Sequence, residues 1–293
     1  MKILIIGGSG ALGTDLKRIL NKEGNSILTL GRASSNDLVV DLTKQLPKID
    51  LHAEIVINCA GIVHNKQHAS KFDEKLIQND LKISQGVFEI VKRLKPKLFL
   101  NISSVSIYGI NRGNNIDESH TKLPNSGYGF SKLSSEKLFM SLTDILVVNL
   151  RLPLIITTRK TGNILRLHNQ ISNGFFFKVN SEKCIKCLVY PEDIAVNINE
   201  FLKLKRGNYN FYSKQVSLEE LVNSLELKYN KKLINIPYIF IILTISILKP
   251  FGFIKPVMSI INSLEKIIYP LTFSREKISK NIDLQYKINK VLI

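Results

Sequence analysis

The chain has 293 residues, and its 41 Lys and Arg against 24 Asp and Glu give a formal net charge of +17. Its hydrophobic content of 44% is enough for a substantial core, which excludes a disordered chain and predicts one large domain or two unequal ones. The charge fits solvated lysines on every face, or attraction to an anionic substrate or membrane surface. The sequence contains no recognisable zinc finger, RNP segment or concentrated basic arm, so we expect no nucleic-acid partner.

The three cysteines form no even disulfide framework, which favours a reducing compartment. The apolar run Ile3–Ile6 is too short for the core of a signal peptide, and no cleavage site follows it. We therefore expect a cytoplasmic protein.

A strand, a glycine-rich turn and a helix open the chain. Lys2–Ile6 predicts a buried strand, and Thr14–Leu20 predicts a helix with its Leu and Ile residues inward. Between them, Gly7 permits a tight turn, Gly10 lets backbone amides approach a pyrophosphate, and Gly13 lets the helix pack closely on the strand. The helix N-terminus adds partial positive charge for the phosphates. The alternative is an ordinary strand-to-helix turn that happens to contain glycines.

The second predicted strand, Ser26–Leu30, ends at Gly31-Arg32, where an acidic residue would bind the adenosine ribose of NAD. No acid stands there, so Arg32 could instead face the 2′-phosphate of NADP, stack on adenine or point to solvent. Leu38–Leu42 predicts a third strand, and it places Asp41 near the expected adenine.

Two more strands and a long helix follow. Glu54–Asn58 leads into Cys59-Ala60-Gly61, a turn of small residues that lets a cofactor pass close to the backbone. The helix expected over 72–94 carries Asn79, which is either a surface amide or a structural group beneath the active site. Leu98–Ile102 is the next strand.

Tyr128 and Lys132 lie four residues apart in another predicted helix, which a strand at 145–150 follows. Residues at i and i+4 share a helix face, and an ammonium beside a phenol favours the phenolate, which can accept a proton. The same spacing occurs at Tyr286 and Lys290, so the pair alone is weak evidence.

The alternation of strands and helices over residues 1–150 predicts an α/β fold with a Rossmann-like, doubly wound parallel sheet. Ligands of such sheets lie at the C-terminal ends of the strands. Gly7, Asp41, Asn58, Ser104 and the loop before Tyr128 would converge there, and no such convergence is expected at Tyr286.

Four segments, in this order, resemble the extended short-chain dehydrogenase/reductase family, in its NAD-dependent nucleotide-sugar epimerase/dehydratase branch. They are the glycine turn, Asn58-Cys59-Ala60-Gly61, the Ser103–Gly109 segment with its Ser-Ser and Tyr-Gly pairs, and Tyr128-x-x-x-Lys132. The resemblance covers nearly the whole chain, more loosely toward its C-terminal end. Val63-His64 and the run Gly162–Arg166 resemble the subgroup that acts in surface-polysaccharide synthesis.

The resemblance implies a catalytic trio of Ser104, Tyr128 and Lys132, and an NAD or NADP cofactor. It implies substrate contacts from Ser104, from Asn163 to the diphosphate and from Lys186 toward the nucleotide, while His64 either edges the sugar pocket or faces solvent. The expected cofactor-binding residues are Gly7, Gly10, Ala11, Leu12, Gly13, Arg32, Asp41, Leu42, Cys59, Ala60, Gly61, Asn79, Tyr128 and Lys132.

Two departures from the family pattern narrow the reaction. Dehydratases of this family carry an Asp-Glu pair just after the catalytic Ser or Thr, where this chain has Val105 and Ser106, so we do not expect a dehydratase. The missing acid after the second strand weakens the case for a tightly held NAD. The leading hypothesis is a 4-epimerase of UDP-hexose or UDP-N-acetylhexosamine. The alternatives are an NADPH-dependent reductase of a 4-keto-6-deoxy nucleotide sugar and a non-catalytic NAD(P)-binding sensor.

Residues 151–293 are expected to form mainly a substrate domain, with 185–205 returning to the first domain through a helix over Val189–Leu204. Cys184-x-x-Cys187 has no second pair at a suitable spacing, so we expect no metal site.

Leu233–Leu248 carries no charge but falls short of the ~20 apolar residues that span a bilayer. The run is either a buried helix of the substrate domain, an oligomer contact such as that of a homodimer, or an interfacial segment. The third reading rests on the flanking Lys231, Lys232 and Lys249. We expect a soluble protein that could contact the inner membrane peripherally through 233–254.

Overall fold

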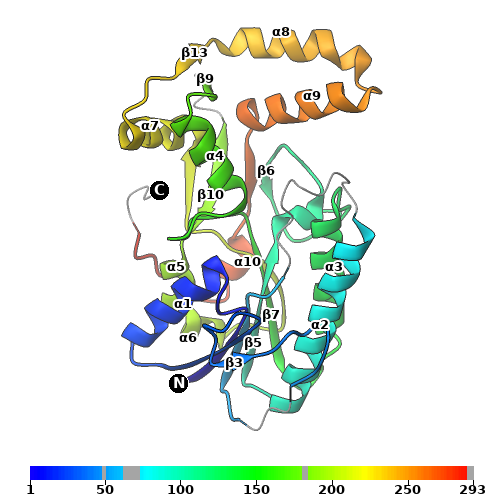
Figure 1. Ribbon diagram of the computed structural model, residues 1–293, viewed down its shortest axis with the longest axis vertical. Helices are drawn as coiled ribbons and strands as arrows, with labels where there is room; N and C mark the ends of the chain where they lie inside the picture. Colours follow the sequence, from blue (N-terminus) through cyan, green and yellow to red (C-terminus); the bar gives the residue numbers. More distant parts are fainter. Residues whose placement is uncertain (48–50, 62–72, 180–183, 289–293) are drawn as a thin grey trace.

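The computed structural model describes residues 1–293 except 48–50, 62–72, 180–183 and 289–293 (Figure 1). A large sheet and its helices form one end of the molecule, and a smaller sheet with further helices forms the other.

The large sheet has seven strands in the order β11-β7-β5-β4-β1-β2-β3, and every neighbouring pair is parallel. The strands are β1 Lys2–Ile6, β2 Ser26–Gly31, β3 Leu38–Val39, β4 Ile55–Asn58, β5 Leu98–Ser104, β7 Leu146–Leu152 and β11 Gly207–Asn210. The strand order reverses between β1 and β4, so a dinucleotide would bind outside the carboxyl ends of these two strands. The predicted Rossmann-like fold is confirmed.

Helices cover both faces of this sheet. They are α1 Ala11–Lys22, α2 Glu74–Leu94, α3 Gly127–Phe139, α5 Pro191–Val196 and α6 Ile198–Phe201. Alternate residues of β1 show the two layers: Ile3 and Ile5 share a cluster with residues of α1, α5 and α6, whereas Leu4 and Ile6 share one with residues of α2 and α3. Coverage on both sides explains why strands such as β4 are buried throughout.

The smaller sheet has the strand order β12-β10-β14-β6, with β8 paired to β10. Its strands are β6 Gly113–Ile116, β8 Leu154–Ile155, β10 Ile185–Val189, β12 Lys214–Ser217 and β14 Leu271–Phe273. Since β6 lies between β5 and α3 in the chain, the loop that leads to Tyr128 is anchored in this second sheet. Beside it, α4 (Gly162–Ser172) packs on α7 (Leu218–Tyr229), and β9 (Phe177–Val179) pairs with β13 (Ile234–Ile236).

A helical hairpin lies at the far end of the molecule from the large sheet (Figure 1). It consists of α8 Tyr238–Leu248, the single turn η2 Lys249–Phe251 and α9 Lys255–Ile268. Ile241 and Ile245 of α8 pack with Ile261 of α9 in a cluster that also includes Val179 of β9. Within the described ranges, no helix is long and apolar enough to cross a membrane.

The third strand is shorter than predicted. It ends at Val39 rather than Leu42, because Asp41 turns the chain by accepting hydrogen bonds from the backbone N–H and the hydroxyl of Thr43, at 3.0 and 2.7 Å.

The helix predicted over 189–204 is also wrong, because β10 continues to Val189 and two short helices follow. The break comes at Asn197, whose φ of −92° and ψ of 6° leave the helical range. Its side-chain amide donates to the carbonyl of Gln285 at 2.7 Å, so it ties the break to the C-terminal segment.

The uncharged run 233–248 is not one buried helix. It forms β13 and then, after Pro237, the helix α8, several of whose apolar side chains are exposed.

Candidate active site

The glycine turn after β1 is tightly packed on its inner side. Gly7 has a φ of +84°, a left-handed conformation, and its N–H donates to the carbonyl of Leu30 at 2.7 Å. A Cβ at Gly7 would lie 2.7 Å from the nitrogen of Ala60, and a Cβ at Gly13 would lie 2.3 Å from the carbonyl oxygen of Gly7. Both positions therefore exclude a side chain, and the packing joins β1, α1 and the turn after β4.

The outer side of the turn fits a dinucleotide. A Cβ at Gly10 would meet only the Gly7 oxygen within 4 Å, and none of the described side chains caps α1, which begins with the amides of Ala11 and Leu12. Nearby, the buried Oδ1 of Asn36 has no hydrogen-bond partner in the described structure and lies 3.0 Å from the position of a Cβ at Gly8. A pyrophosphate at the helix N-terminus and a sugar hydroxyl on Asn36 would supply the partners that these groups lack.

Arg32 and Asp41 lie at the outer edge of the sheet. Arg32 is exposed just beyond β2. Its charge contributes to the lowered pKa of Asp41, whose main cause is the hydrogen bond from the Thr43 hydroxyl. Leu42 packs on α2, where a Cβ at Gly86 would lie 3.1 Å from its side chain.

The acid beside β2 is Asp37, which is not conspicuous in the sequence. It accepts hydrogen bonds from the backbone N–H and hydroxyl of Thr29, at 2.8 and 2.7 Å, and pairs with Lys17 at 3.2 Å. The hydrogen bond from the Thr29 hydroxyl is the main cause of its lowered pKa. Its carboxylate is therefore ionised and already bonded within the fold.

The turn after β4 brings small residues against the active-site lysine. Asn58 Oδ1 accepts from the N–H of Ala60 at 3.1 Å, which bends the chain toward Gly61. A Cβ at Gly61 would lie only 3.0 Å from Lys132 Nζ. Burial raises the pKa of the Cys59 thiol, and the ammonium of Lys132 opposes this shift.

Helix α2 contributes an unexpected acid here. Asn79 is half-buried, whereas the next residue, Asp80, is 3% exposed, with Oδ1 3.6 Å from the position of a Cβ at Gly61. The approach of Asp80 and Lys132 to the same glycine shows that both charges line this turn.

Ser104 ends β5 and is the N-cap residue of η1 (Val105–Tyr108). Its Oγ accepts hydrogen bonds from the backbone N–H of Ser106 at 3.2 Å and from the Ser106 hydroxyl at 3.0 Å. Both bonds use Ser104 as an acceptor, so its own proton can be donated to a ligand oxygen.

Tyr128 and Lys132 share one face of α3. Lys132 Nζ lies 5.8 Å from the centroid of the Tyr128 ring and donates to the carbonyl of Ile102 in β5 at 3.1 Å. The side chain of Ser126 caps the helix by accepting from the N–H of Gly129 at 3.2 Å. Its contacts with the Tyr128 ring and the Ile102 carbonyl fix the ammonium of Lys132 between the phenol and the strand that ends in Ser104.

Two glycines hold η1 and its end close to α3 and to the loop before α3. A Cβ at Gly129 would lie 2.6 Å from the carbonyl oxygen of Ser106, and a Cβ at Gly109 would lie 1.8 Å from that of Leu123. Since Gly129 follows Tyr128 directly, this contact holds the tyrosine close to the serine turn.

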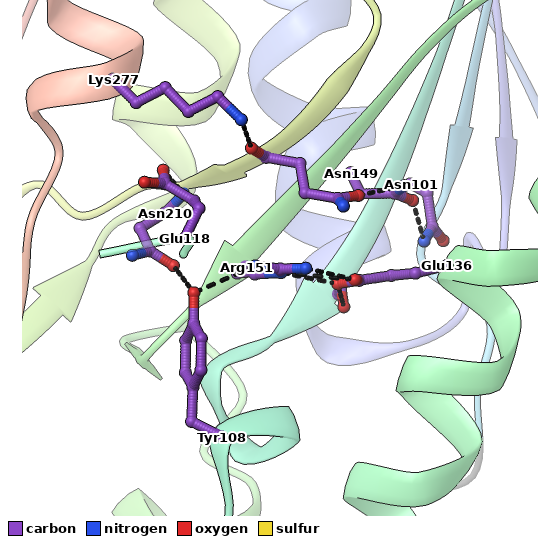
Figure 2. A network of polar contacts seen from close by, with 10 residues as sticks. Asn101, Tyr108, Glu118, Glu136, Asn149, Arg151, Asn210 and Lys277 are labelled. Carbon is purple, nitrogen blue, oxygen red and sulfur yellow. Dashed lines mark hydrogen bonds and ion pairs between the residues drawn. The ribbon is translucent and has the colours of Figure 1, made fainter. Parts of the chain in front are cut away.

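A buried ion pair joins β7 to α3, the helix that carries Tyr128 and Lys132 (Figure 2). Arg151 of β7 and Glu136 of α3 are 2.8 Å apart, with side chains 2% and 3% exposed. Glu136 also accepts from the hydroxyl of Ser103, the residue before Ser104. Arg151 donates to the Tyr108 hydroxyl at 3.1 Å. The network therefore fixes both ends of the segment that carries Ser104 relative to α3.

Four asparagines form a ladder across the sheet at matching register positions of β4, β5, β7 and β11. The side-chain amide of Asn58 donates to Asn101 at 2.9 Å, Asn101 to Asn149 at 2.7 Å, and Asn149 to Asn208 at 2.8 Å. Figure 2 shows the central part of this ladder beside the ion pair. Since Asn58 also accepts from Ala60, the ladder connects the far edge of the sheet with the turn at Lys132.

The structure describes the three other predicted substrate-contacting residues to different extents. His64 lies outside the described residues. Asn163 lies in the first turn of α4, and its side chain is outside the description. Lys186 lies in β10 and donates to the carbonyl of Tyr269 at 2.9 Å, and burial lowers its pKa. Its role toward a nucleotide stays a prediction.

Arg159 is a further cation beside the glycine turn, where its guanidinium donates to the carbonyl of Ser9 at 3.0 Å. The preceding residue, Thr158, donates its N–H to the buried carboxylate of Asp15 in α1 at 2.8 Å. A segment of the second half therefore packs beside the glycine turn and α1. Sequence spacing could not reveal this, because 150 residues separate Arg159 from Ser9.

Cys184 and Cys187 are buried free thiols. Cys184 Sγ donates to the carbonyl of Tyr269 at 3.3 Å, and burial raises the pKa of Cys187 to about 11. Among the described residues, no three His, Cys, Asp or Glu side chains are grouped so that they could hold a metal ion.

A parallel, doubly wound sheet with a glycine turn at its reversal point, and with Ser104, Tyr128 and Lys132 at β5 and α3, defines an NAD(P)-binding enzyme of the short-chain dehydrogenase type. The model of the NAD dependent epimerase/dehydratase family matches residues 3–196, and the chain belongs to this family.

Two curated proteins illustrate the range of relatives. The chain is 27% identical over 258 residues to the N-acetyl-alpha-D-glucosaminyl-diphospho-ditrans,octacis-undecaprenol 4-epimerase of Escherichia coli O157:H7, covering 80% of this chain and 75% of that protein. It is 27% identical over 114 residues to CDP-abequose synthase of Yersinia pseudotuberculosis, covering 36% of this chain and 40% of that protein.

Solved structures share the fold. The Bordetella bronchiseptica enzyme WbmG in complex with NAD and UDP superposes with a TM-score of 0.69 at 16% identity, over 98% of this chain and 89% of WbmG. The UDP-N-acetylglucosamine 4-epimerase of Bacillus cereus superposes with a TM-score of 0.69 at 18% identity, over 99% of this chain and 95% of that one.

Family membership makes the chain an NAD-dependent enzyme. The glycine turn, the open N-terminus of α1 and the unsatisfied Asn36 fit this cofactor. Arg32 therefore need not face a 2′-phosphate.

Proposed function

We propose that the protein is an NAD-dependent sugar 4-epimerase that acts on a nucleotide-linked hexose or N-acetylhexosamine in surface-polysaccharide synthesis. The observation that carries the proposal is the placement of Lys132 between the Tyr128 ring and the end of β5, where Ser104 stands. The 4-epimerase of Escherichia coli O157:H7, matched over 80% of this chain, supports the reaction type.

Each side chain has one task in this reaction. Tyr128 as phenolate removes the proton of the sugar C4 hydroxyl, and Lys132 stabilises that phenolate. Ser104 donates its proton as a hydrogen bond to the C4 oxygen as a carbonyl develops. Bound NAD supplies hydride acceptance and return. Epimerisation requires that the 4-keto sugar present its other face before the hydride returns, so the reaction has no net redox change.

A second candidate substrate is the same sugar diphosphate carried on a polyprenol. The relative from Escherichia coli O157:H7 acts on an undecaprenol-linked sugar by its name. In this chain, the exposed apolar hairpin α8–α9 favours the same carrier class. Residues of the trio contact only the sugar end in either case.

The test is direct. The purified protein is incubated with NAD and with UDP-N-acetylglucosamine, UDP-glucose or an undecaprenyl diphosphate-linked N-acetylglucosamine in detergent, and the C4 configuration is followed by NMR. Conversion of one of these substrates is expected. Consumption of NADPH with a 4-keto-6-deoxy nucleotide sugar, without epimerisation, would establish a reductase instead. Silence in all assays with NAD bound would favour a sensor.

Replacement of the catalytic phenol sharpens the test. Tyr128→Phe is expected to lower kcat by about 100-fold or more, the usual contribution of a positioned proton acceptor. Affinity for NAD, measured by calorimetry, is expected to change little, because the ring is kept. Full activity in Tyr128→Phe would contradict the mechanism.

A further inference from the structure

The outer face of the α8–α9 hairpin is apolar and exposed. Ile239, Phe240, Leu243 and Ile247 of α8 are 56%, 58%, 50% and 68% exposed. Their spacing of about one helical turn places them on one side of the helix, away from the Ile241 and Ile245 face that packs on α9.

The surface continues through the turn into α9. Phe251, Phe253 and Ile254 are 51%, 83% and 42% exposed, and Ile260 of α9 is 49% exposed. A group of exposed apolar side chains as large as this one, on one helical hairpin, marks an interaction site rather than a chance exposure.

The charged residues that the chain contributes to this surface before Glu265 of α9 are all basic. From residue 227 to residue 264 the chain contains no Asp or Glu, and its charged residues there are Lys228, Lys231, Lys232, Lys249 and Lys255. Lys249 and Lys255 are exposed around the turn between α8 and α9, and Lys231 and Lys232 are exposed just before β13, the strand that leads into α8. An apolar face bordered by lysines complements the anionic headgroups and acyl chains of a bilayer surface.

The same charges disfavour a second copy of the chain as the partner that covers this apolar face. Two copies, each with a formal net charge of +17 and with lysines around the apolar patch, would repel one another when the patches meet. The 11 residues of α8 extend about 16 Å, half the ~30 Å of a hydrocarbon core, so the helix fits the interface and does not span it.

The hairpin is also joined to the active-site segment. Asn111, two residues after Gly109, donates to Asn262 of α9 at 3.0 Å, and Arg112 approaches Glu265 at 3.7 Å. A cavity of about 230 Å³ lies between these residues and the inner face of α8. The hairpin is therefore in contact with the loop that follows Ser104 and η1.

We propose that the α8–α9 hairpin docks the protein on an anionic lipid bilayer, with Phe240, Leu243, Ile247 and Phe253 inserted at the headgroup level and the flanking lysines on the lipid phosphates. This goes beyond the proposed epimerase activity and does not depend on it. It places the loop after Ser104 toward the bilayer, where a sugar diphosphate on a lipid would be within reach.

Binding to vesicles tests the proposal. The full chain is sedimented with vesicles of phosphatidylcholine containing phosphatidylglycerol, or of phosphatidylcholine alone. The protein is expected to bind the anionic vesicles at low salt. Its affinity is expected to fall at least several-fold when the salt concentration is raised, or when the vesicles lack phosphatidylglycerol. No binding to anionic vesicles at low salt would overturn the proposal.

A matched pair of variants locates the surface. Leu243→Gln/Ile247→Gln removes two exposed apolar side chains from α8, and Val39→Gln/Leu46→Gln removes two of similar exposure, 55% and 50%, from the large-sheet end. The α8 variant is expected to bind anionic vesicles about ten-fold more weakly, since less apolar area is buried in lipid, and the control variant is expected to bind like the wild type.

Three readouts keep the outcome unambiguous. Thermal unfolding checks that both variants fold, and turnover of a soluble nucleotide sugar checks that the α8 variant keeps its active site, so failure of docking and failure of the epimerase proposal are separable. Equal vesicle binding by the α8 variant and the wild type would overturn the proposal. So would a dimer in sedimentation velocity that the α8 substitutions abolish, because a second copy would then be the cover.

Discussion

The carboxylate of Glu136 stabilises a guanidinium that has almost no access to water. Glu136→Gln would leave Arg151 charged at 2% exposure without its ion-pair partner. The free energy of unfolding is expected to fall by about 3–5 kcal/mol, the cost of breaking a buried pair from one side.

The control for this substitution is a surface pair. Glu276 and Lys280 are 65% and 70% exposed, so Glu276→Gln is expected to change stability by less than about 1 kcal/mol. Urea unfolding measures both variants. Equal effects would contradict the assignment of Glu136 as a buried structural charge.

His168 is expected to make the stability of the protein depend on pH. It is 1% exposed and its Nδ1 lies 2.7 Å from the Tyr229 hydroxyl. Burial, followed by the charges of Lys160 and Lys228, lowers its pKa from the ordinary 6.5 to about 4. Between these values the unfolded chain binds a proton that the folded protein does not, so the free energy of unfolding should fall as pH decreases from about 6.5 to about 4.

The variant His168→Gln is expected to have a shallower decline over this pH window, because its side chain does not titrate. His52→Gln, at an exposed histidine, is expected to keep the wild-type slope. Chemical denaturation at pH 7 and pH 4.5 measures the difference. Identical slopes in wild type and His168→Gln would exclude this histidine as the cause.

Among the elements, the contact of η1 with α3 decides how near Tyr128 lies to Ser104. A methyl group in Gly129→Ala would sit 2.6 Å from the Ser106 oxygen, so α3 must move away from η1. Turnover is expected to fall by about 10- to 100-fold, the scale of effect that follows from a displacement near 1 Å. Gly207→Ala, whose Cβ would meet nothing nearer than 3.6 Å, is expected to keep normal turnover. Steady-state kinetics of both variants checks the prediction.

Elements with a strong local signal were predictable from the sequence. The buried strands β1, β4 and β5 and the glycine turn follow from apolar runs and small residues. The early end of β3 depends on a side-chain turn at Asp41, and the break between α5 and α6 depends on a contact of Asn197 with Gln285. A contact such as that of Asn197 with Gln285 joins distant parts of the chain, so no local sequence pattern reveals it.

The same distinction applies to the site. The pair Tyr128 and Lys132 is visible as an i, i+4 spacing, and the structure places Lys132 against Ile102 in β5. Asp80, Asp37 and Arg159 approach the site through tertiary packing alone. The apolar run 233–248 was visible too, but whether its face is covered depends on what packs on it, and the described structure leaves one side exposed.

At the scale of the whole molecule, the large sheet carries the glycine turn that fits the cofactor, and the second sheet anchors the loop to Tyr128 through β6. The α8–α9 hairpin lies at the end opposite the large sheet (Figure 1). The arrangement joins a site for reversible hydride transfer to a surface suited to lipid. The reaction and the docking surface are therefore separate properties that separate experiments can test.

The most direct test of the proposed epimerisation follows the hydrogen at C4. UDP-N-acetylglucosamine, or whichever sugar diphosphate the protein converts, is labelled with deuterium at C4 and incubated with the protein and a catalytic amount of NAD. We predict that the epimerised product keeps the deuterium at C4, with no accumulation of reduced cofactor. A product with hydrogen from another source at C4, or turnover that requires stoichiometric NADPH, would contradict a 4-epimerase built on Ser104, Tyr128 and Lys132.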